Sequence, residues 1–162
     1  MNDTTIRTAP HHLLRDPMHL LSLGFGTGCV SIMPGTCGTL IGVAFYLVLA
    51  PLPLVWYLGF CTLGFLLGVG LCERTGNALG VSDHPAIVWD EVIGYLITMV
   101  AVPFQWQWVI TGFIAFRVLD IGKPWPVGWL DKNVKGGLGV MLDDFVGALI
   151  ACGILHFLLY LL

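Results

Sequence analysis

The chain has 162 residues, of which 57% are hydrophobic and only 10% are charged, and its net charge is −3. A soluble domain carries roughly 25% charged residues, so this composition argues against an ordinary water-soluble protein and predicts one membrane-embedded domain over residues 1–162. Nothing in the charge balance predicts a nucleic-acid partner. Five cysteines without a CxxC pair predict neither a disulfide framework nor a zinc site.

The first sixteen residues are polar and lack the apolar core of a signal peptide, so we expect a flexible or surface-lying arm over residues 1–16. Its histidines, together with His19, could bind a metal, but scattered surface histidines are the favoured interpretation. Residues 17–33 are apolar and rich in glycine. They predict a short helix or a re-entrant segment at the membrane interface, because irregular backbone at depth needs protein or water around it.

Residues 34–39, Pro-Gly-Thr-Cys-Gly-Thr, open an apolar helix over residues 40–50. The free N–H groups of a helix start can hold a phosphate, and Thr36 and Thr39 would then contribute hydroxyls. Either threonine is also a plausible N-cap. The sequence does not decide between phosphate binding and N-capping for these threonines.

Pro51 and Pro53 predict a turn, after which residues 54–72 form an uncharged run of 19 residues. That length is close to the ~20 residues needed to cross a bilayer core. Residues 73–89 then read as a polar linker with a possible short helix ended by Gly80. Asp83 precedes His84 and Pro85 there, and a helix N-cap is its simplest role.

The central stretch, residues 87–123, contains an uncharged run of 25 residues, 92–116, with charged residues at both ends. Pro103 and the following Phe-Gln-Trp-Gln-Trp sequence interrupt this run. A turn there would fold the two charged ends back beside each other, and the tryptophans would suit an interfacial aromatic belt. The alternative is one spanning helix kinked at Pro103, which would place the two ends on opposite sides of the membrane.

A second polar loop, residues 122–139, precedes a helix over residues 140–162 whose only charges are Asp143 and Asp144. With both turns in place, the sequence predicts an all-α polytopic bundle of about five helices, some of them too short for a full span. All seven Lys and Arg residues then fall on one face, which the positive-inside tendency assigns to the cytoplasm. The predicted helices cover residues 40–50, 54–72, 87–102, 106–121 and 140–162.

Five carboxylates from three helix ends gather at this face. Unpaired, they would repel one another, and a hard divalent cation such as Mg²⁺ is the economical partner because it takes oxygen ligands. Arg117 and Asp120 share a helix face at i,i+3, and Lys123 continues that face toward an anion. A cation-bridged phosphate needs these same parts. The five acids are Asp90, Glu91, Asp120, Asp143 and Asp144.

These residues closely resemble the motifs of the phosphatidylglycerophosphatase A family over about residues 19–151. The resemblance implies a Mg²⁺-dependent enzyme of the bacterial inner membrane that hydrolyses phosphatidylglycerophosphate to phosphatidylglycerol and phosphate. The motifs, in chain order, are Pro34-Gly35-Thr36-x-Gly38-Thr39, Asp83-His84, Trp89-Asp90-Glu91-x-x-Gly94, Phe116-Arg117-x-x-Asp120-x-x-Lys123-Pro124-Trp125-Pro126 and Met141-x-Asp143-Asp144.

Roles follow from residue chemistry. We expect Mg²⁺ on Glu91, Asp120, Asp143 and Asp144. Lys123, Thr36 and Thr39 would hold phosphate oxygens, with Arg117 either joining them or orienting Asp120. Asp90 is the expected general base, with nucleophile as the less favoured role.

Two histidines carry further expectations. His84 could protonate the leaving alkoxide, because its ordinary pKa of about 6.5 suits that task, or be a simple loop histidine. His156, in the middle of the last helix, is expected to be a packed or hydrogen-bonded core residue.

Other classes of membrane protein fit less well. A small divalent-cation transporter would also place carboxylates at helix ends, but it should carry ionisable groups through the membrane depth and often a repeated half. A CDP-alcohol phosphotransferase would show an Asp-Gly and Ala-Arg motif that this chain lacks. A structural subunit would leave the five acids unexplained. The oligomeric state stays open.

Overall fold

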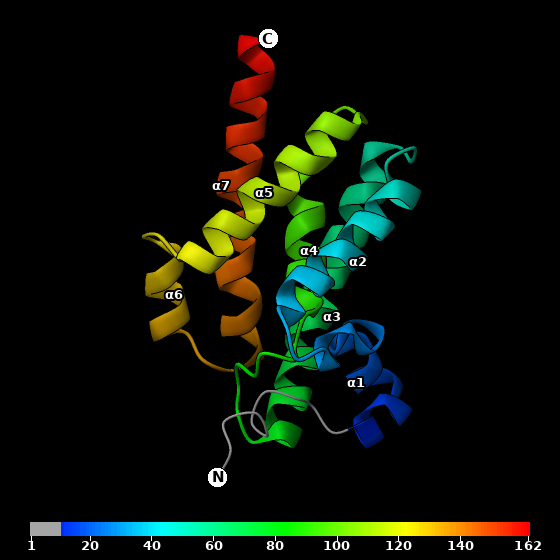
Figure 1. Ribbon diagram of the computed structural model, residues 1–162, viewed down its shortest axis with the longest axis vertical. Coiled ribbons are helices and arrows are strands. Elements are labelled where there is room, and N and C mark those ends of the chain that lie inside the picture. Colours follow the sequence, from blue (N-terminus) through cyan, green and yellow to red (C-terminus); the bar gives the residue numbers. More distant parts are fainter. Residues whose placement is uncertain (1–10) are drawn as a thin grey trace.

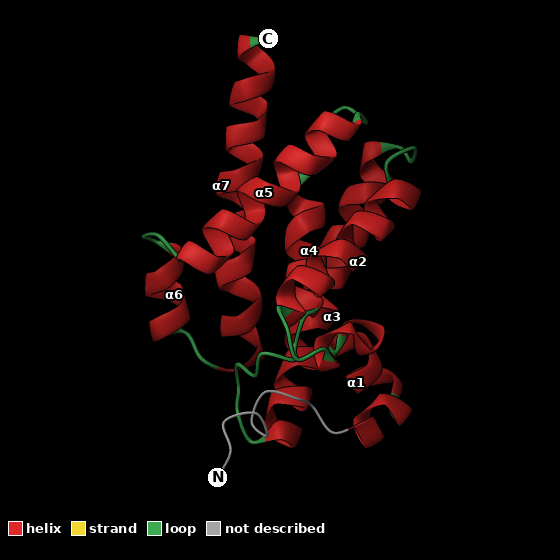
Figure 2. Ribbon diagram, in the orientation of Figure 1, coloured by secondary structure: helices red, strands yellow, loops and turns green. Residues whose placement is uncertain are grey.

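The structure, a computed structural model, describes residues 11–162 and is helical throughout them, without a strand (Figures 1 and 2). The flexible arm predicted for residues 1–10 lies outside the described residues. Residues 11–16, the rest of that arm, form a short 3-10 helix and the N-cap of α1. The elements in order are η2 His11–Arg15, α1 Pro17–Ser22, η3 Gly24–Cys29, α2 Pro34–Leu49, α3 Leu54–Leu79, α4 Trp89–Thr98, α5 Trp106–Gly122, α6 Val127–Asn133 and α7 Gly136–Leu161.

Two helices, α3 and α7, are long and apolar enough to cross a membrane. Each has 26 residues, so each is about 39 Å long, which exceeds the ~30 Å hydrocarbon core. Large apolar side chains such as Val55, Trp56 and Leu66 point outward from α3. An exposed apolar surface of this kind suits lipid rather than water, and it associates the protein with a membrane.

Helix α4 forms the centre of the bundle and packs against α2, α3, α5 and α7. Its apolar side chains, among them Val92, Ile93 and Leu96, are fully buried. Gly94 lets α5 approach closely, since a Cβ there would lie 2.5 Å from Cζ of Phe116. The position and rotation of α4 therefore fix where its first residues, Asp90 and Glu91, point.

The break between α4 and α5 confirms the predicted turn. Helix α4 ends at Thr98 and α5 begins at Trp106, so the alternative of one kinked helix is wrong. Carbonyl groups near the break accept hydrogen bonds from side chains of other helices. Tyr57 Oη donates to the Leu96 oxygen at 2.6 Å, and His156 Nε2 lies 2.9 Å from the Val100 oxygen. His156 is exposed on the bundle surface, so its predicted hydrogen bond is present but its predicted core position is wrong.

The glycine-rich N-terminal segment forms the short elements α1 and η3 beside α3. His19 is buried, and its Nδ1 lies 2.9 Å from Thr75 Oγ1. The expectation of a surface histidine is therefore wrong for His19.

The helix ends divide into two sets (Figure 1). The α2–α3 turn, the α4–α5 turn and the C-terminus lie toward the top of the view, whereas α1, the end of α3 and the α6–α7 connection lie toward the bottom. The predicted functional residues lie on segments nearer the second set of helix ends. The fold thus gathers the polar segments at one end of the bundle.

Candidate active site

Three carboxylates meet where α4 begins beside α7. Asp90 and Glu91 lie in the first turn of α4, and Asp144 lies on α7, which packs against α4. One oxygen from each lies within 4.8 Å of the others. Asp90 and Asp144 are buried, and 13% of the Glu91 side chain is exposed. We call these three residues the acidic cluster.

The acidic cluster has unsatisfied acceptors. Asp90 Oδ1, Glu91 Oε2 and Asp144 Oδ2 are buried without a hydrogen-bond partner among residues 11–162. Buried carboxylates in this state are costly unless a cation or a donor compensates them. Ligands on opposite sides of one Mg²⁺ lie about 4.2 Å apart, given ~2.1 Å bonds. The oxygen chemistry and the closeness of the three groups make the cluster a candidate Mg²⁺ site.

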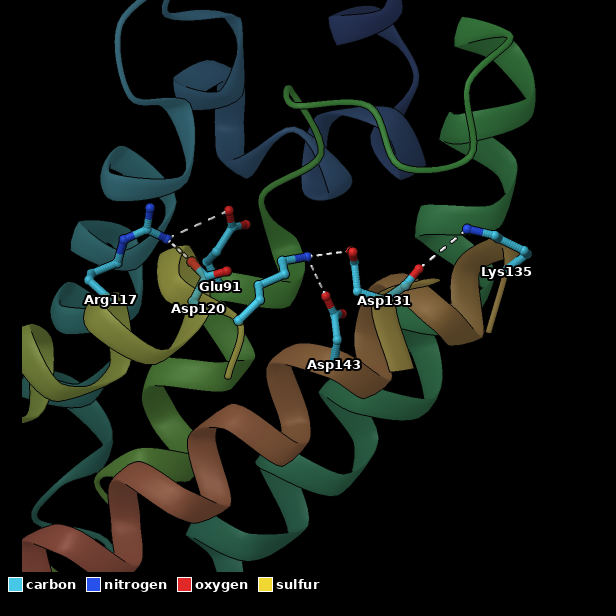
Figure 3. Close-up of polar contacts among 7 residues, drawn as sticks. Glu91, Arg117, Asp120, Asp131, Lys135 and Asp143 are labelled. Carbon is cyan, nitrogen blue, oxygen red and sulfur yellow. Dashed lines mark hydrogen bonds and ion pairs between the residues drawn. The ribbon is translucent and has the colours of Figure 1, made fainter. Parts of the chain in front are cut away.

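Arg117 and Asp120, one turn apart on α5, form an ion pair at the edge of the cluster (Figure 3). Arg117 Nη1 also lies 3.9 Å from Glu91 Oε1. Among the four predicted metal ligands, Glu91 and Asp144 are thus in the cluster, and Asp120 borders it. Asp90, predicted as the base, lies inside the cluster.

Lys123 and the fourth predicted ligand, Asp143, form a separate group (Figure 3). Lys123 Nζ lies 2.7 Å from Asp143 Oδ2 and 2.5 Å from Asp131 Oδ1. Burial by itself would lower the pKa of Lys123, but the hydrogen bonds and charges of the two aspartates raise it above its usual value. Lys123 is therefore a fixed ammonium group that joins α5, α6 and α7.

The sequence predicts no role for Asp131, because it shows only a charged residue within a polar loop. The short helix α6, which turns Asp131 toward Lys123, is also not predicted. A seven-residue helix is too short to show a hydrophobic period, so the contact could not be found from the pattern.

Helix α2 brings its first turn against the cluster. It begins at Pro34, six residues earlier than predicted, and its N-cap is Met33, so neither Thr36 nor Thr39 is an N-cap. Thr39 Oγ1 is buried and donates to the Gly35 oxygen at 2.9 Å, so this hydroxyl is already engaged within its own helix. Thr36 Oγ1 is buried with no partner in the described chain. Of the two predicted threonines, Thr36 is thus the one whose hydroxyl is available for a ligand.

His84 and Asp83 lie in the loop before α4. His84 is buried, and its Nδ1 accepts a 3.1 Å hydrogen bond from the Ala86 N–H, which leaves Nε2 to carry the exchangeable proton. Asp83 is not an N-cap, because α4 begins six residues later with Val88 as its cap. Asp83 instead borders a polar cavity near Asp143.

Two helices are long and apolar enough to cross a membrane, and a buried carboxylate cluster lies at one end of the bundle with an arginine and a lysine near it. These features are typical of a helical membrane protein that binds or reacts with phosphate groups. The family model of Phosphatidylglycerophosphatase A matches residues 20–159. The chain belongs to the phosphatidylglycerophosphatase A family.

Two relatives carry the same description. Phosphatidylglycerophosphatase A of Escherichia coli (strain K12) is 48% identical over 146 residues, which are 90% of this chain and 85% of the relative. The protein of that name from Haemophilus influenzae is 42% identical over 140 residues, 85% of this chain and 86% of the relative. No solved structure matches the chain.

Proposed function

We propose that this protein hydrolyses the phosphomonoester of phosphatidylglycerophosphate in a Mg²⁺-dependent reaction, giving phosphatidylglycerol and phosphate. The observation that carries the proposal is the set of orphaned carboxylate oxygens of Asp90, Glu91 and Asp144, which lie beside Arg117 in a chain of this family. The two relatives described above are named as phosphatases of this lipid.

The acidic cluster would hold the cation, and Mg²⁺ supplies charge neutralisation and polarisation of the phosphoryl oxygens when bound. Asp120 borders the cluster, and Arg117 pairs with only one of its oxygens. We therefore assign Asp120 to accept a proton from the attacking water, whereas the sequence predicts Asp90 for that role. Because His84 Nδ1 accepts from the Ala86 N–H, we assign His84 a hydrogen bond from Nε2 to the leaving oxygen in place of the predicted proton transfer, and the alkoxide takes its proton from solvent water.

Two basic groups lie near the acidic cluster: Arg117 is 3.9 Å from Glu91 Oε1, and Lys123 binds Asp143, the neighbour of Asp144. Lys123 has three N–H donors and uses two of them on Asp131 and Asp143, so the third is free for a phosphate oxygen. Arg117 Nε is buried without an acceptor among the described residues. The first turn of α2, with the Thr36 hydroxyl, adds donors. These groups would neutralise charge on the transferred phosphoryl group.

The same proposal places the bundle across the bacterial inner membrane as a multi-pass protein. The described Lys and Arg residues lie on the short N-terminal elements, the last two turns of α3 and α5, and the segment of residues 123–135. The positive-inside tendency then assigns this end, and the acidic cluster with it, to the cytoplasm.

A divalent-cation transporter is the alternative. It requires ionisable groups along the depth of the bundle. Near the α4–α5 break, four side chains with ionisable groups are each engaged in a hydrogen bond with a backbone carbonyl: Tyr46, Tyr57, Tyr95 and His156. This arrangement seals the helix break and favours the enzyme.

Phosphate release from phosphatidylglycerophosphate by the purified protein tests the proposal. We expect release with Mg²⁺, none with a chelator, and a loss of at least 100-fold in the Asp144→Asn variant, in line with removal of a charged group that the reaction needs. The same variant should lose Mn²⁺ binding measured by electron paramagnetic resonance. A folded wild-type protein that releases no phosphate but carries Mg²⁺ into vesicles would establish the transporter instead.

A further inference from the structure

A polar cavity opens beside the acidic cluster, between the loop after α3, the end of α6 and the start of α7. Its volume is about 160 Å³. Asp143, which lines it, directly precedes Asp144 of the cluster, so the cavity reaches the edge of the candidate active site. We call it the α6–α7 cavity; its polar lining comprises Ser82, Asp83, Asp131, Lys132, Lys135 and Asp143.

Asp143, which lines this cavity, carries an unsatisfied acceptor. The residue is only 4% exposed, and its Oδ2 accepts the hydrogen bond from Lys123. Its Oδ1 is buried without a partner among residues 11–162. A buried carboxylate oxygen in this state is destabilising, and a ligand that brings a donor would relieve the cost.

The charges around the cavity balance. Three carboxylates, from Asp83, Asp131 and Asp143, face three ammonium groups, from Lys123, Lys132 and Lys135. A bare divalent cation or a phosphate would therefore meet no excess of the opposite charge. A hydroxyl group both donates and accepts, and it can use carboxylates and ammonium groups together. The lining thus favours a neutral, hydroxyl-bearing ligand.

We propose that the α6–α7 cavity binds the glycerol part of the lipid headgroup while the phosphomonoester lies at the acidic cluster; this rests on the proposed function. In phosphatidylglycerophosphate a glycerol with a free hydroxyl links the two phosphates. Phosphatidate carries its phosphomonoester directly on diacylglycerol and has no such group. Asp143 Oδ1 and Asp83 accept from the hydroxyl, and Lys132 and Lys135 donate to it. The cavity therefore selects lipid phosphates that carry a polyol.

Substrate selectivity tests this assignment. We expect Asp83→Ala and the Lys132→Ala/Lys135→Ala pair each to lower kcat/KM for phosphatidylglycerophosphate about tenfold, mainly through KM, because hydrogen bonds to the polyol are lost. Activity on phosphatidate should stay unchanged. Arg15→Ala, which removes an exposed charge at the same end of the bundle, is the matched control and should change neither.

A second measurement works where phosphatidate turns over too slowly. Soluble glycerophosphoglycerol carries the polyol without a phosphomonoester, and calorimetry should show at least fivefold weaker binding to both variants than to the wild type. Equal losses on both lipids, or unchanged binding of glycerophosphoglycerol, would overturn the cavity assignment and leave the phosphatase intact. Failure of the wild type to release phosphate would instead count against the proposed function. The binding of glycerophosphoglycerol would then still test whether the α6–α7 cavity binds glycerol.

Discussion

Lys123 is the basic side chain that ties three helices of the site together. It ends α5 with a left-handed backbone, φ 40°, which turns the chain toward α6. Its ammonium group then reaches Asp131 on α6 and Asp143 on α7 (Figure 3). Two of its three donors are engaged, so its orientation is fixed before any phosphate arrives. Such preorganisation is what makes a charged donor effective in catalysis.

Substitution of Lys123 should separate phosphate binding from simple anchoring at the membrane surface. We expect Lys123→Ala to lose roughly 100-fold in kcat/KM, as removal of a preorganised donor does elsewhere. Lys123→Arg keeps the charge for Asp143 and anchors equally well, but its planar fork cannot replace a compact ammonium group, and we expect at least a roughly tenfold loss. Steady-state kinetics with thermal melting as the folding check would measure both. Full activity in both variants would leave Lys123 without a role in the reaction.

Gly35 lies where α2 meets the cluster, and a Cβ at this position would collide with Glu91 Oε1. We expect Gly35→Ala to displace the Glu91 carboxylate and to lower activity at least tenfold, since small misplacements in a site are costly. Gly59→Ala is the matched control, because a Cβ there meets nothing within 4 Å. Similar activities for the two variants in phosphate release would show that Glu91 tolerates displacement.

At the scale of the elements, the residues that interrupt helices were easier to predict from the sequence than the full length of each helix. Pro103 and its polar neighbours marked the α4–α5 break correctly. The sequence predicts a helix end at Gly80, and the structure confirms it: the φ of Gly80 is 73°, which suits glycine. The predicted boundary at residue 72 is wrong, because α3 runs without a break from Leu54 to Leu79. Glu73 and Arg74 are compatible with a helix that has left the membrane, so their charges did not mark an end.

The same limit applies to the candidate site. The acids were identified from their types and positions at helix ends. Their division into the cluster and the Lys123 group depends on how α4 and α7 are rotated against each other. Asp143 and Asp144 are neighbours on α7, but one faces Lys123 and the other faces Asp90 and Glu91. That rotation follows from packing contacts such as Gly94 of α4 with Asp144 of α7, where a Cβ on Gly94 would lie 3.6 Å from the Asp144 Cβ, and the sequence does not order such contacts in space.

Helix α4 ends inside the bundle, and the Leu96 carbonyl in its last turn accepts a backbone hydrogen bond of 3.2 Å from the Met99 N–H and a second, shorter one from another helix. Tyr57→Phe removes the hydroxyl that donates to the Leu96 oxygen at 2.6 Å, and we expect a loss of about 1 kcal/mol in the free energy of unfolding. Unfolding in detergent, followed by tryptophan fluorescence, would measure it. Tyr160→Phe alters a side chain that is 87% exposed and should cost nothing. Equal stabilities for the two variants would mean that the α4 carbonyls find other donors.

For the whole molecule, Arg117 and Asp120 lie beside the acidic cluster because the end of α5 returns to the end of the bundle where α4 begins. Arg117, on α5, lies 3.9 Å from Glu91 Oε1 on α4 only because the chain reverses between residues 98 and 106. The α2–α3 turn and the C-terminus lie at the opposite end with the reversal (Figure 1). The polar end would then meet headgroups and water, while the long apolar faces of α3 and α7 meet lipid.

This arrangement makes a prediction about sidedness in the cell membrane. In a background without the five native cysteines, Gln105→Cys in the α4–α5 turn should react with an impermeant reagent from the periplasmic side. Ser82→Cys and Asn133→Cys should react only after the cytoplasmic side is opened, because both lie in segments near the acidic cluster. Phosphate release by each variant checks that it is folded. Labelling at position 133 from outside would place Lys123 and the cluster at the periplasmic surface, and labelling of positions 105 and 133 from the same side would contradict the reversal of the chain across the membrane.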